Sequence, residues 1–427
     1  MRFPLAAALA LACLLAALLP AAADARRGPC MVGTEQPRCH VWTGKLAWVD
    51  DGDTLHVDVH GDGTRKPLHV RMIGIQAMEQ TRYARNSRAG DCHAVEATER
   101  LEALIRRGKK RVRLAAQDPE SRTRGRYFRS VAVKLGGRWR DLGAIMVGEG
   151  RALWLANRAG YAFNQRYSVL TQRAERLGRG LFAAEACAPG PNPGHPVRVW
   201  VNADADGADR LYPEGEWVRV KNLDPESPLP LDGWHVRDTG LRRYTFPAGT
   251  LLPPGGTLTV RVGRGEPADA DEHYWGLRKA VFDNPTFDRR ALGDGAYLFD
   301  PHGDLRASMM YPCRVECHDP LQGALAISAK PRGRERVDVT NTSGGPVDLE
   351  GYRLATPPFA YHFAAGTVLQ PGETLRLRMG GDPDDDTPLR RHWGMMEPIL
   401  RNRGDVVRVT TYTWIELACD AWGDRSC

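Results

Sequence analysis

The chain has 427 residues, a formal net charge of +7 and 26% charged residues. A chain of this length usually forms about three domains. The charge is uneven, because residues 40–187 carry 27 Lys and Arg against 16 Asp and Glu, whereas residues 188–427 are net acidic. A polybasic nucleic-acid-binding tail is therefore excluded, and the excess positive charge lies on an N-terminal module, where it would attract a polyanion.

Residues 1–25 have the pattern of a signal peptide. Arg2 supplies the positive start, Phe3 to Leu19 is an apolar run rich in Ala and Leu, and small residues follow it. The run is shorter than the roughly 20 residues that span a bilayer, and no second apolar span follows. We expect a secreted protein without a transmembrane segment. A lipoprotein modified at Cys13 is the alternative, although no lipobox surrounds that residue.

Secretion implies that the remaining eight cysteines form disulfides. Eight cysteines allow 105 connectivities. We expect Cys30 to pair with Cys39 and Cys92 with Cys187. The last four, which would pair among themselves, are Cys313, Cys317, Cys419 and Cys427. Zinc at the Cys313 and Cys317 pair is disfavoured, because no histidine stands at a suitable spacing.

The first predicted elements of the N-terminal module are two strands that follow an Asp-Gly turn. Thr54 to Val59 alternates apolar and polar residues, and His69 to Ile75 is a more apolar strand. Gly52 suits the tight turn, because glycine accepts positive φ without steric cost. This segment concentrates four residues with useful chemistry: Asp51, Asp53, Arg71 and Glu79.

These side chains have the chemistry of a phosphodiester-hydrolysis site. Asp51 and Asp53 leave the same face if both lie on extended backbone, and grouped carboxylate oxygens suit Ca²⁺ or Mg²⁺. Arg71 and the later Arg126 each offer a planar fork for a phosphate, and Glu79 is a candidate general base for water. On spacing alone, the alternative is an ordinary hairpin turn with arginines on the surface.

Ordered motifs over residues 40–187 resemble the staphylococcal nuclease (thermonuclease) family. They are Asp51-Gly52-Asp53-Thr54, Val70-Arg71, Gly74-Ile75, Glu79, Gly125-Arg126, Asp141-Leu142, Gly148-Glu149-Gly150-Arg151-Ala152 and Leu177-Gly178-Arg179-Gly180-Leu181-Phe182. The resemblance implies an OB-fold-like β-barrel with helices, and Ca²⁺-dependent hydrolysis of DNA and RNA that leaves 3′-phosphates. By position it implies Asp53 as a metal ligand, Arg71 and Arg126 as phosphate clamps, and Glu79 as the base that activates water.

The chain departs from the family pattern at two places. Gln76 stands where the family has a second metal-binding Asp. Its amide oxygen still ligates Ca²⁺ but brings no charge, so we expect Asp53 and Gln76 to form a weakened cation site. The second departure is Arg122-Thr123-Arg124, which precedes Gly125; the extra arginine either binds backbone phosphate or is a solvated loop charge.

Two helices are predicted in the same module. Asp91 to Arg107 has apolar residues at helical spacing, and Ser168 to Arg179 reads as a final helix. The basic run 106–111 is either a nucleic-acid contact or a solvated helix end. Four aromatic residues either stack on bases or fill the core: Trp139, Trp154, Tyr161 and Tyr167.

A proline-rich linker, residues 188–196, separates this module from an internally repeated tail. The motif around Leu231-Asp232-Gly233-Trp234 recurs around Leu349-Glu350-Gly351-Tyr352, 118 residues later. Short alternating strands between Gly and Pro turns indicate β-sandwiches. The first copy, residues 195–313, resembles the lamin-tail domain, an immunoglobulin-like sandwich, on Glu216-Trp217-Val218, Asn222 and Pro254-Gly255. The second copy, residues 318–427, is divergent and lacks the Glu-Trp opening.

We therefore expect an α+β chain, with an OB-fold-like barrel and helices followed by two immunoglobulin-like sandwiches. The expected function is a secreted, Ca²⁺-assisted nuclease that acts on DNA and RNA as a monomer. The tail would bind a cell-envelope or protein partner. The alternative is a nuclease-fold protein with a decayed cation site, which binds nucleic acid or a cell surface without cleaving.

Overall fold

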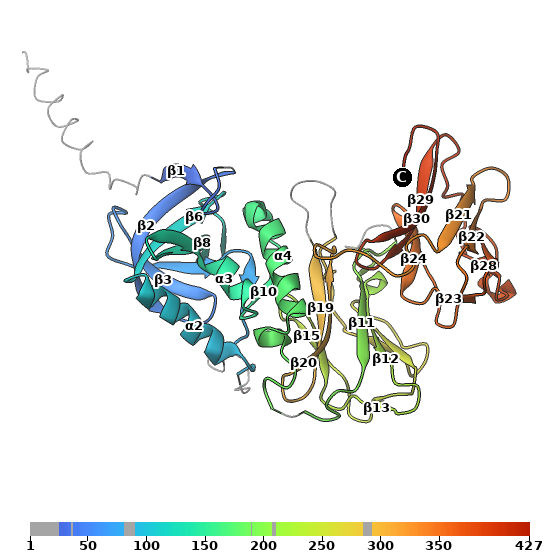
Figure 1. Ribbon diagram of the computed structural model, residues 1–427, viewed down its shortest axis with the longest axis horizontal. Coiled ribbons are helices and arrows are strands. Elements are labelled where there is room, and N and C mark those ends of the chain that lie inside the picture. Colours follow the sequence, from blue (N-terminus) through green and yellow to red (C-terminus); the bar gives the residue numbers. More distant parts are fainter. Residues whose placement is uncertain (1–24, 36, 81–89, 189, 207–210, 285–292) are drawn as a thin grey trace, which may run out of the picture. The chain divides into compact units, whose positions relative to one another are not determined.

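The computed structural model describes residues 25–35, 37–80, 90–188, 190–206, 211–284 and 293–427. The predicted signal peptide, apart from its last residue, lies outside this part. The chain divides into two compact units, Met1–Leu181 and Phe182–Cys427. None of the described helices has the length and apolar character needed to cross a membrane. Each unit is mostly β-structure (Figure 1).

A closed five-stranded barrel forms the centre of the first unit. Its strands are β2 (Arg38–Val49), β3 (Thr54–Val59), β4 (Leu68–Met72), β6 (Arg111–Ala116) and β8 (Arg126–Leu135). They pair in the order β2-β3-β4-β8-β6, and β6 pairs back onto β2, which closes the ring. All these pairings are antiparallel except β4 with β8. Inward-facing apolar side chains of these strands are fully buried and form the barrel core.

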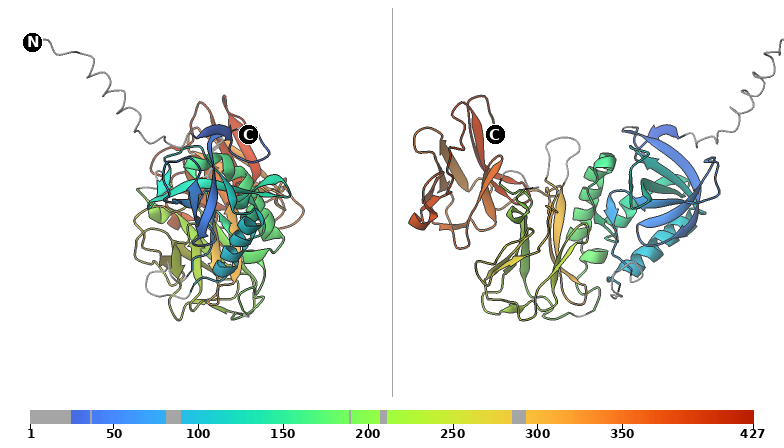
Figure 2. Two further views of the ribbon diagram at one scale, coloured as in Figure 1. Left: turned by 90° about the vertical axis from the view of Figure 1, so that its left-hand side faces the viewer. Right: turned by 180° about the vertical axis from the view of Figure 1, so that it is seen from behind.

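Shorter elements complete the first unit. They are β1 (Arg26–Pro29), β5 (Ile75–Gln76), β7 (Arg122–Thr123), β9 (Arg138–Asp141), β10 (Leu153–Trp154), α2 (Ala94–Arg107), α3 (Leu142–Gly148), η3 (Arg158–Gly160), α4 (Tyr161–Arg176) and η4 (Gly180–Phe182). Helix α2 lies along the barrel in Figure 1 and in the reverse view of Figure 2. It buries the five apolar residues that define its periodicity: Ala94, Ala97, Leu101, Leu104 and Ile105. The predicted first helix is thereby confirmed.

Two predicted elements of this unit have different bounds. Helix α4 begins at Tyr161, seven residues before the predicted start, and ends before Gly178, whose φ of 56° is left-handed. The predicted strand His69 to Ile75 is two strands, because Gly74 turns the chain with φ of 79°. A side chain at Gly74 would also collide with the buried ring of Tyr167, 2.9 Å from an added Cβ.

The second unit contains two β-sandwiches. The elements of the first are β11 (Val197–Asn202), η5 (Pro213–Gly215), β12 (Trp217–Asn222), β13 (Leu229–Pro230), β14 (His235–Asp238), β15 (Arg243–Thr245), β16 (Leu251–Leu252), β17 (Thr257–Arg261), β18 (Glu272–Tyr274), β19 (Asp294–Phe299) and β20 (Leu305–Tyr311). Its sheets run β11-β12-β17-β18 and β15-β14-β19-β20, with a short β13-β16 pair. The two layers face each other in Figures 1 and 2.

The second sandwich has the same topology. Its elements are β21 (Leu325–Lys330), β22 (Arg336–Asn341), β23 (Val347–Asp348), β24 (Tyr352–Thr356), β25 (Phe359–His362), β26 (Val368–Leu369), β27 (Thr374–Arg378), η6 (Pro383–Asp385), β28 (Arg390–His392), β29 (Asp405–Thr411) and β30 (Glu416–Trp422). Its sheets run β21-β22-β27-β28 and β25-β24-β29-β30, with a β23-β26 pair. Among the described strands of each sandwich, only the third and fourth strands of the first sheet pair in parallel. The strand orders therefore match element for element, as the sequence repeat predicts.

Buried polar residues explain which positions recur between the two copies. Asn222 donates from Nδ2 to Ser227 O and Pro253 O, and Asn341 donates from Nδ2 to Gly345 O and Leu369 O. Each asparagine thus ties the end of its strand to two other backbone segments. A buried amide that satisfies several backbone carbonyls cannot be replaced by an apolar residue without leaving them unpaired.

The opening of the second copy is less divergent than the sequence suggests. Glu216 accepts hydrogen bonds from the backbone N–H groups of Val281 and Phe282. Glu335 accepts in the same way from Ile399 and Leu400. The glutamate of the Glu-Trp opening is therefore present in both copies, and only its tryptophan is replaced in the second, by an arginine.

The cysteine predictions agree with the structure where it describes the pairs. Disulfides join Cys30 to Cys39, Cys313 to Cys317, and Cys419 to Cys427. Cys92 and Cys187 are also disulfide-bonded. The bond between Cys313 and Cys317 removes the zinc alternative at that pair. Extensive disulfide bonding indicates an oxidising compartment.

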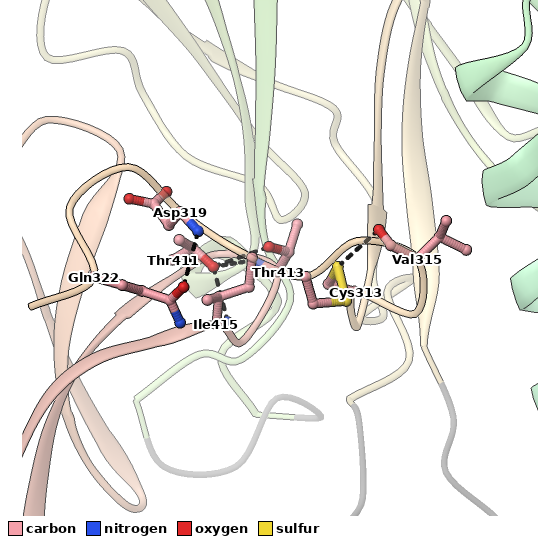
Figure 3. The surroundings of a disulfide bond; sticks show 8 residues. Cys313, Val315, Asp319, Gln322, Thr411, Thr413 and Ile415 are labelled. Carbon is pink, nitrogen blue, oxygen red and sulfur yellow. Dashed lines mark hydrogen bonds between the residues drawn. A yellow bond between two sulfur atoms is a disulfide. The ribbon is translucent and has the colours of Figure 1, made fainter.

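The Cys313–Cys317 disulfide lies in the segment that joins the two sandwiches (Figure 3). The backbone N–H of Cys313 donates to the carbonyl of Thr413, over 2.9 Å. The Oγ1 atoms of Thr411 and Thr413 lie 2.9 Å apart in the adjacent turn, which connects β29 to β30. The joining segment is therefore fixed both by its own disulfide and by the last hairpin of the chain.

Candidate functional site

The turn between β2 and β3 directs Asp53 into the structure. Asp51 Oδ1 accepts a hydrogen bond from the backbone N–H of Asp53, over 2.9 Å, in the manner of an Asx turn. The condition under which the two aspartates would share one face, extended backbone at both, is therefore not met. Gly52 is required for space rather than for its φ, since an added Cβ would lie 2.7 Å from the Cβ atoms of Ala77 and Ala97.

Asp53 is 3% exposed, and its carboxylate contacts three donors. Its Oδ1 accepts from Thr54 Oγ1 over 2.9 Å and lies 2.8 Å from Arg71 Nη1. Its Oδ2 accepts from the backbone N–H of Ala77 over 2.7 Å. These contacts join the β2–β3 turn to strand β4 and to the segment that follows β5.

Arg71 connects Asp53 to the residues predicted as cation ligand and base. Its Nη2 donates to Gln76 Oε1 over 2.6 Å, and Gln76 Nε2 donates to Glu79 Oε1 over 3.1 Å. Arg71 and Gln76 are 5% and 7% exposed. The side chains from Asp53 to Glu79 therefore form one continuous hydrogen-bonded chain.

Arg126, the first residue of β8, reaches the same place from later in the sequence. Its Nη1 donates to Thr54 Oγ1 over 3.3 Å, and Thr54 in turn donates to Asp53. The barrel explains the meeting, because Thr54 is the cross-strand partner of Arg71 and β4 is hydrogen-bonded to β8. All five predicted site residues, from Asp53 to Arg126, are thus brought together at one end of the barrel.

Burial raises the pKa of both carboxyl groups of the site. The pKa of Asp53 rises to about 7, because desolvation outweighs the opposing charge of Arg71. The pKa of Glu79 also rises, through burial first and then through the negative charge of Asp51. The raised pKa makes the ionised Glu79 carboxylate a stronger proton acceptor.

Two supporting residues were not predicted. Thr54 bridges Asp53 and Arg126. This role depends on how the strands are aligned, and the Asp-Gly-Asp-Thr motif does not reveal that alignment. Asp91 Oδ2 accepts from the backbone N–H of Glu79 over 3.3 Å, and the Asp91 N–H donates to Glu79 O over 2.9 Å. The only sequence signal for Asp91 is its position just before helix α2.

The donor set of the site fits a hard divalent cation. The carboxylate of Asp53 and the amide oxygen of Gln76 both contact Arg71, and Glu79 is hydrogen-bonded to Gln76. Oxygen ligands of this kind suit Ca²⁺. Arg71 presently satisfies the two oxygens nearest to it, so a cation held by Asp53 and Gln76 requires the guanidinium to take a different partner.

The structure also describes the surroundings of the other residues that the sequence suggested as nucleic-acid contacts. Tyr167 is fully buried, with its hydroxyl 2.9 Å from Asp141 Oδ1, and Trp154 is 2% exposed. Both therefore fill the core rather than stack on bases. In the basic run, Arg106 forms an i,i+4 ion pair with Glu102 on the exposed face of α2. Arg124 lies in a turn with φ of 48° and is exposed.

Comparison with known proteins identifies part of the tail. Residues 197–312 match the family model described as Lamin Tail Domain. The matched range coincides with the first sandwich, from the start of β11 to just past β20, and agrees with the lamin-tail resemblance of that copy. The comparison with curated proteins gives no match.

Proposed function

We propose that this protein is a secreted nuclease that hydrolyses DNA and RNA with the help of Ca²⁺ and leaves 3′-phosphates. The observation that carries this proposal is the convergence of Asp53, Arg71, Glu79 and Arg126, from two strands and two loops, at one end of the barrel. A closed five-stranded barrel with this strand order is consistent with the OB-fold type.

The residues suit in-line attack of water on a phosphodiester. Glu79 takes a proton from water, whose oxygen attacks phosphorus, and the bond from phosphorus to the 5′ oxygen breaks. The leaving 5′ oxygen takes up a proton from solvent, Glu79 then releases its proton to solvent, and the phosphate stays on the 3′ oxygen. Arg71 and Arg126 stabilise the negative charge that develops on the phosphoryl oxygens. Ca²⁺, held by Asp53 and Gln76, would supply further charge neutralisation.

Arg71 links cation binding to substrate binding in this proposal. Its fork now contacts the oxygens of Asp53 and Gln76. A phosphate offers the guanidinium a bidentate partner. Transfer of Arg71 to the phosphate then frees the two oxygens for the cation, so each ligand favours binding of the other.

The decisive experiment is incubation of the purified full chain with plasmid DNA and with RNA, with Ca²⁺ or with chelator. Cleavage that requires the cation, with 3′-phosphate ends on the products, supports the proposal. The matched variants are Glu79→Gln, which keeps the shape but loses the base, and the exposed Glu96→Gln on α2 as control. We expect Glu79→Gln to lower the rate by about 10²–10⁴-fold, and Glu96→Gln to leave it unchanged.

Gln76 favours a second candidate, a protein of this fold that binds nucleic acid without cleaving it. The site has one fewer carboxylate than the family pattern, and Arg71 occupies the two oxygens of Asp53 and Gln76. Salt-sensitive binding of DNA without cleavage under any divalent cation would favour this candidate. In both cases we propose that the two sandwiches bind a protein or cell-envelope partner and that the chain is a monomer.

A further inference from the structure

A second polar cluster lies on the barrel beside the proposed active site. Trp48, His56 and His69 are direct cross-strand neighbours on β2, β3 and β4. Their rings are stacked, with centroids 4.0 Å apart for Trp48 and His56 and 4.1 Å apart for the two histidines. The family resemblance assigns no role to these residues.

Asp50 brings a carboxylate to the two imidazoles. Its Oδ2 lies 3.0 Å from His56 Nε2 and 3.2 Å from His69 Nε2. The two nearly parallel rings, with an interplanar angle of 16°, therefore present the same nitrogen to one oxygen. The three possible ligand atoms all lie within 4.8 Å of one another.

The carboxylate is oriented by groups outside the triad. Trp48 Nε1 donates to Asp50 Oδ1 over 3.0 Å, which leaves Oδ2 facing the histidines. The backbone N–H of Asp50 donates to Thr54 O over 2.9 Å, which fixes the turn that carries the side chain. An outer hydrogen bond that orients a carboxylate ligand is typical of metal sites.

One ligand atom is poorly satisfied without an ion. Within the described residues, the buried Nε2 of His69 has no hydrogen bond of acceptable geometry, although Asp50 Oδ2 is close. His56 and Asp50 have side chains only 16% and 17% exposed, whereas His69 is 37% exposed. The cluster is therefore enclosed on the β3 side and open to entry of an ion beside His69.

We propose that Asp50, His56 and His69 form a binding site for a divalent transition-metal ion of the Zn²⁺ class. Two imidazole nitrogens and one carboxylate oxygen are the donors that Zn²⁺ and Cu²⁺ prefer over Ca²⁺. With bonds of about 2.1 Å, tetrahedral ligands stand about 3.4 Å apart. The two distances to Asp50 Oδ2, 3.0 Å and 3.2 Å, lie within a few tenths of an ångström of that separation, and the stacked imidazole rings would tilt to direct both Nε2 atoms at the ion.

This site is distinct from the proposed Ca²⁺ site. Along β3 and β4, the cross-strand pair of His56 and His69 lies two residues away from the pair of Thr54 and Arg71. Two residues of strand separate the pairs by about 7 Å. The two sites differ in donor chemistry, since one offers nitrogen and the other only oxygen. The metal site does not depend on nuclease activity.

The test measures binding of Zn²⁺ alone to the chelator-treated full chain by equilibrium dialysis. The variants are His56→Gln, His69→Gln and the double variant; the matched control is His60→Gln, an exposed histidine just after β3. We expect the wild type to bind one more Zn²⁺ per chain than the double variant, and each single variant to weaken that affinity by about 100-fold or more. His60→Gln should bind as the wild type does.

A second measurement keeps the proposal testable if a variant folds poorly. Co²⁺ bound to the wild type should give the visible absorption of a four- or five-coordinate nitrogen–oxygen site, which excess Ca²⁺ does not remove. Trp48→Phe keeps the ring stack but loses the donor to Asp50, and should weaken Zn²⁺ binding by about 10-fold. Equal Zn²⁺ binding by the wild type and a folded double variant would overturn the proposal, as would a Co²⁺ spectrum abolished by Ca²⁺.

Discussion

Arg71 donates from Nη2 to the amide oxygen of Gln76 over 2.6 Å, in a position where both side chains are almost completely buried. The contact joins Gln76, where the chain departs from the nuclease resemblance, to the arginine that we propose as a phosphate clamp. A neutral amide accepts this hydrogen bond without the attraction that a carboxylate would add. Gln76 therefore holds Arg71 near the proposed cation ligands less strongly than an aspartate at that position would.

Replacing Gln76 with Asp should strengthen Ca²⁺ binding. The substitution adds a negative charge to an oxygen donor set, which is the main determinant of Ca²⁺ affinity in such sites. We expect the Ca²⁺ concentration for half-maximal cleavage to fall by about tenfold. Gln76→Asn is the matched control, because it has the length of Asp without the charge. Identical Ca²⁺ dependence in the two variants would show that residue 76 does not face the ion.

Replacing Thr54 with Val tests whether its hydroxyl positions the site. Thr54 Oγ1 donates to Asp53 Oδ1 and accepts from Arg126 Nη1. Valine keeps the volume and β-branching but removes both hydrogen bonds, so we expect the cleavage rate to fall by about 10-fold or more while KM changes less. Thr54→Ser retains the hydroxyl and should restore most of the rate. A Thr54→Val enzyme with wild-type kinetics would rule out this positioning role.

The cation requirement should depend on pH. A proton and a cation compete for Asp53, whose pKa is raised by burial to about 7. The folded-state pKa lies above the ordinary value, so the carboxyl is protonated below pH 7 and ionised above it. We expect the half-maximal Ca²⁺ concentration to fall as pH rises from 6 to 8 and then to level off. The check is a Ca²⁺ titration of plasmid cleavage at each pH; a requirement that does not change with pH would contradict it.

The residue types of the site could be predicted from the sequence, but their contacts could not. The motifs alone indicate the chemistry of the four residues Asp53, Arg71, Glu79 and Arg126. The bridge through Thr54 depends on the register of β3 against β4 and on closure of the barrel. Register and closure are set by contacts distant in sequence, which local patterns do not encode.

In the tail, too, the sequence predicts the overall arrangement but does not reveal every shared contact. The repeat spacing predicts two sandwiches, and both copies have the same strand order. The equivalence of Glu335 to Glu216 escapes the sequence comparison because the neighbouring tryptophan is lost in the second copy. Only the backbone N–H groups that each glutamate binds reveal the shared role.

The first sandwich contains a buried acid that should make its stability fall as pH rises. Burial, reinforced by the nearby Asp238, raises the pKa of Asp294 to about 8, whereas an unfolded aspartate titrates near 4. Between these values the folded state binds more protons than the unfolded state. The free energy of unfolding therefore decreases as pH rises from about 4 to about 8.

Asp294→Asn should remove this pH dependence. Asp294 Oδ1 accepts from the backbone N–H groups of Thr239 and Gly295, and an asparagine oxygen can accept the same bonds. At pH 8.5 we expect the variant to unfold about 2–4 °C higher than the wild type, the shift that 1 kcal/mol produces in a unit of this size. At pH 5 the two should differ little. The exposed Asp384→Asn is the control, and a lower midpoint for Asp294→Asn at pH 8.5 would show that the buried carboxylate is stabilising.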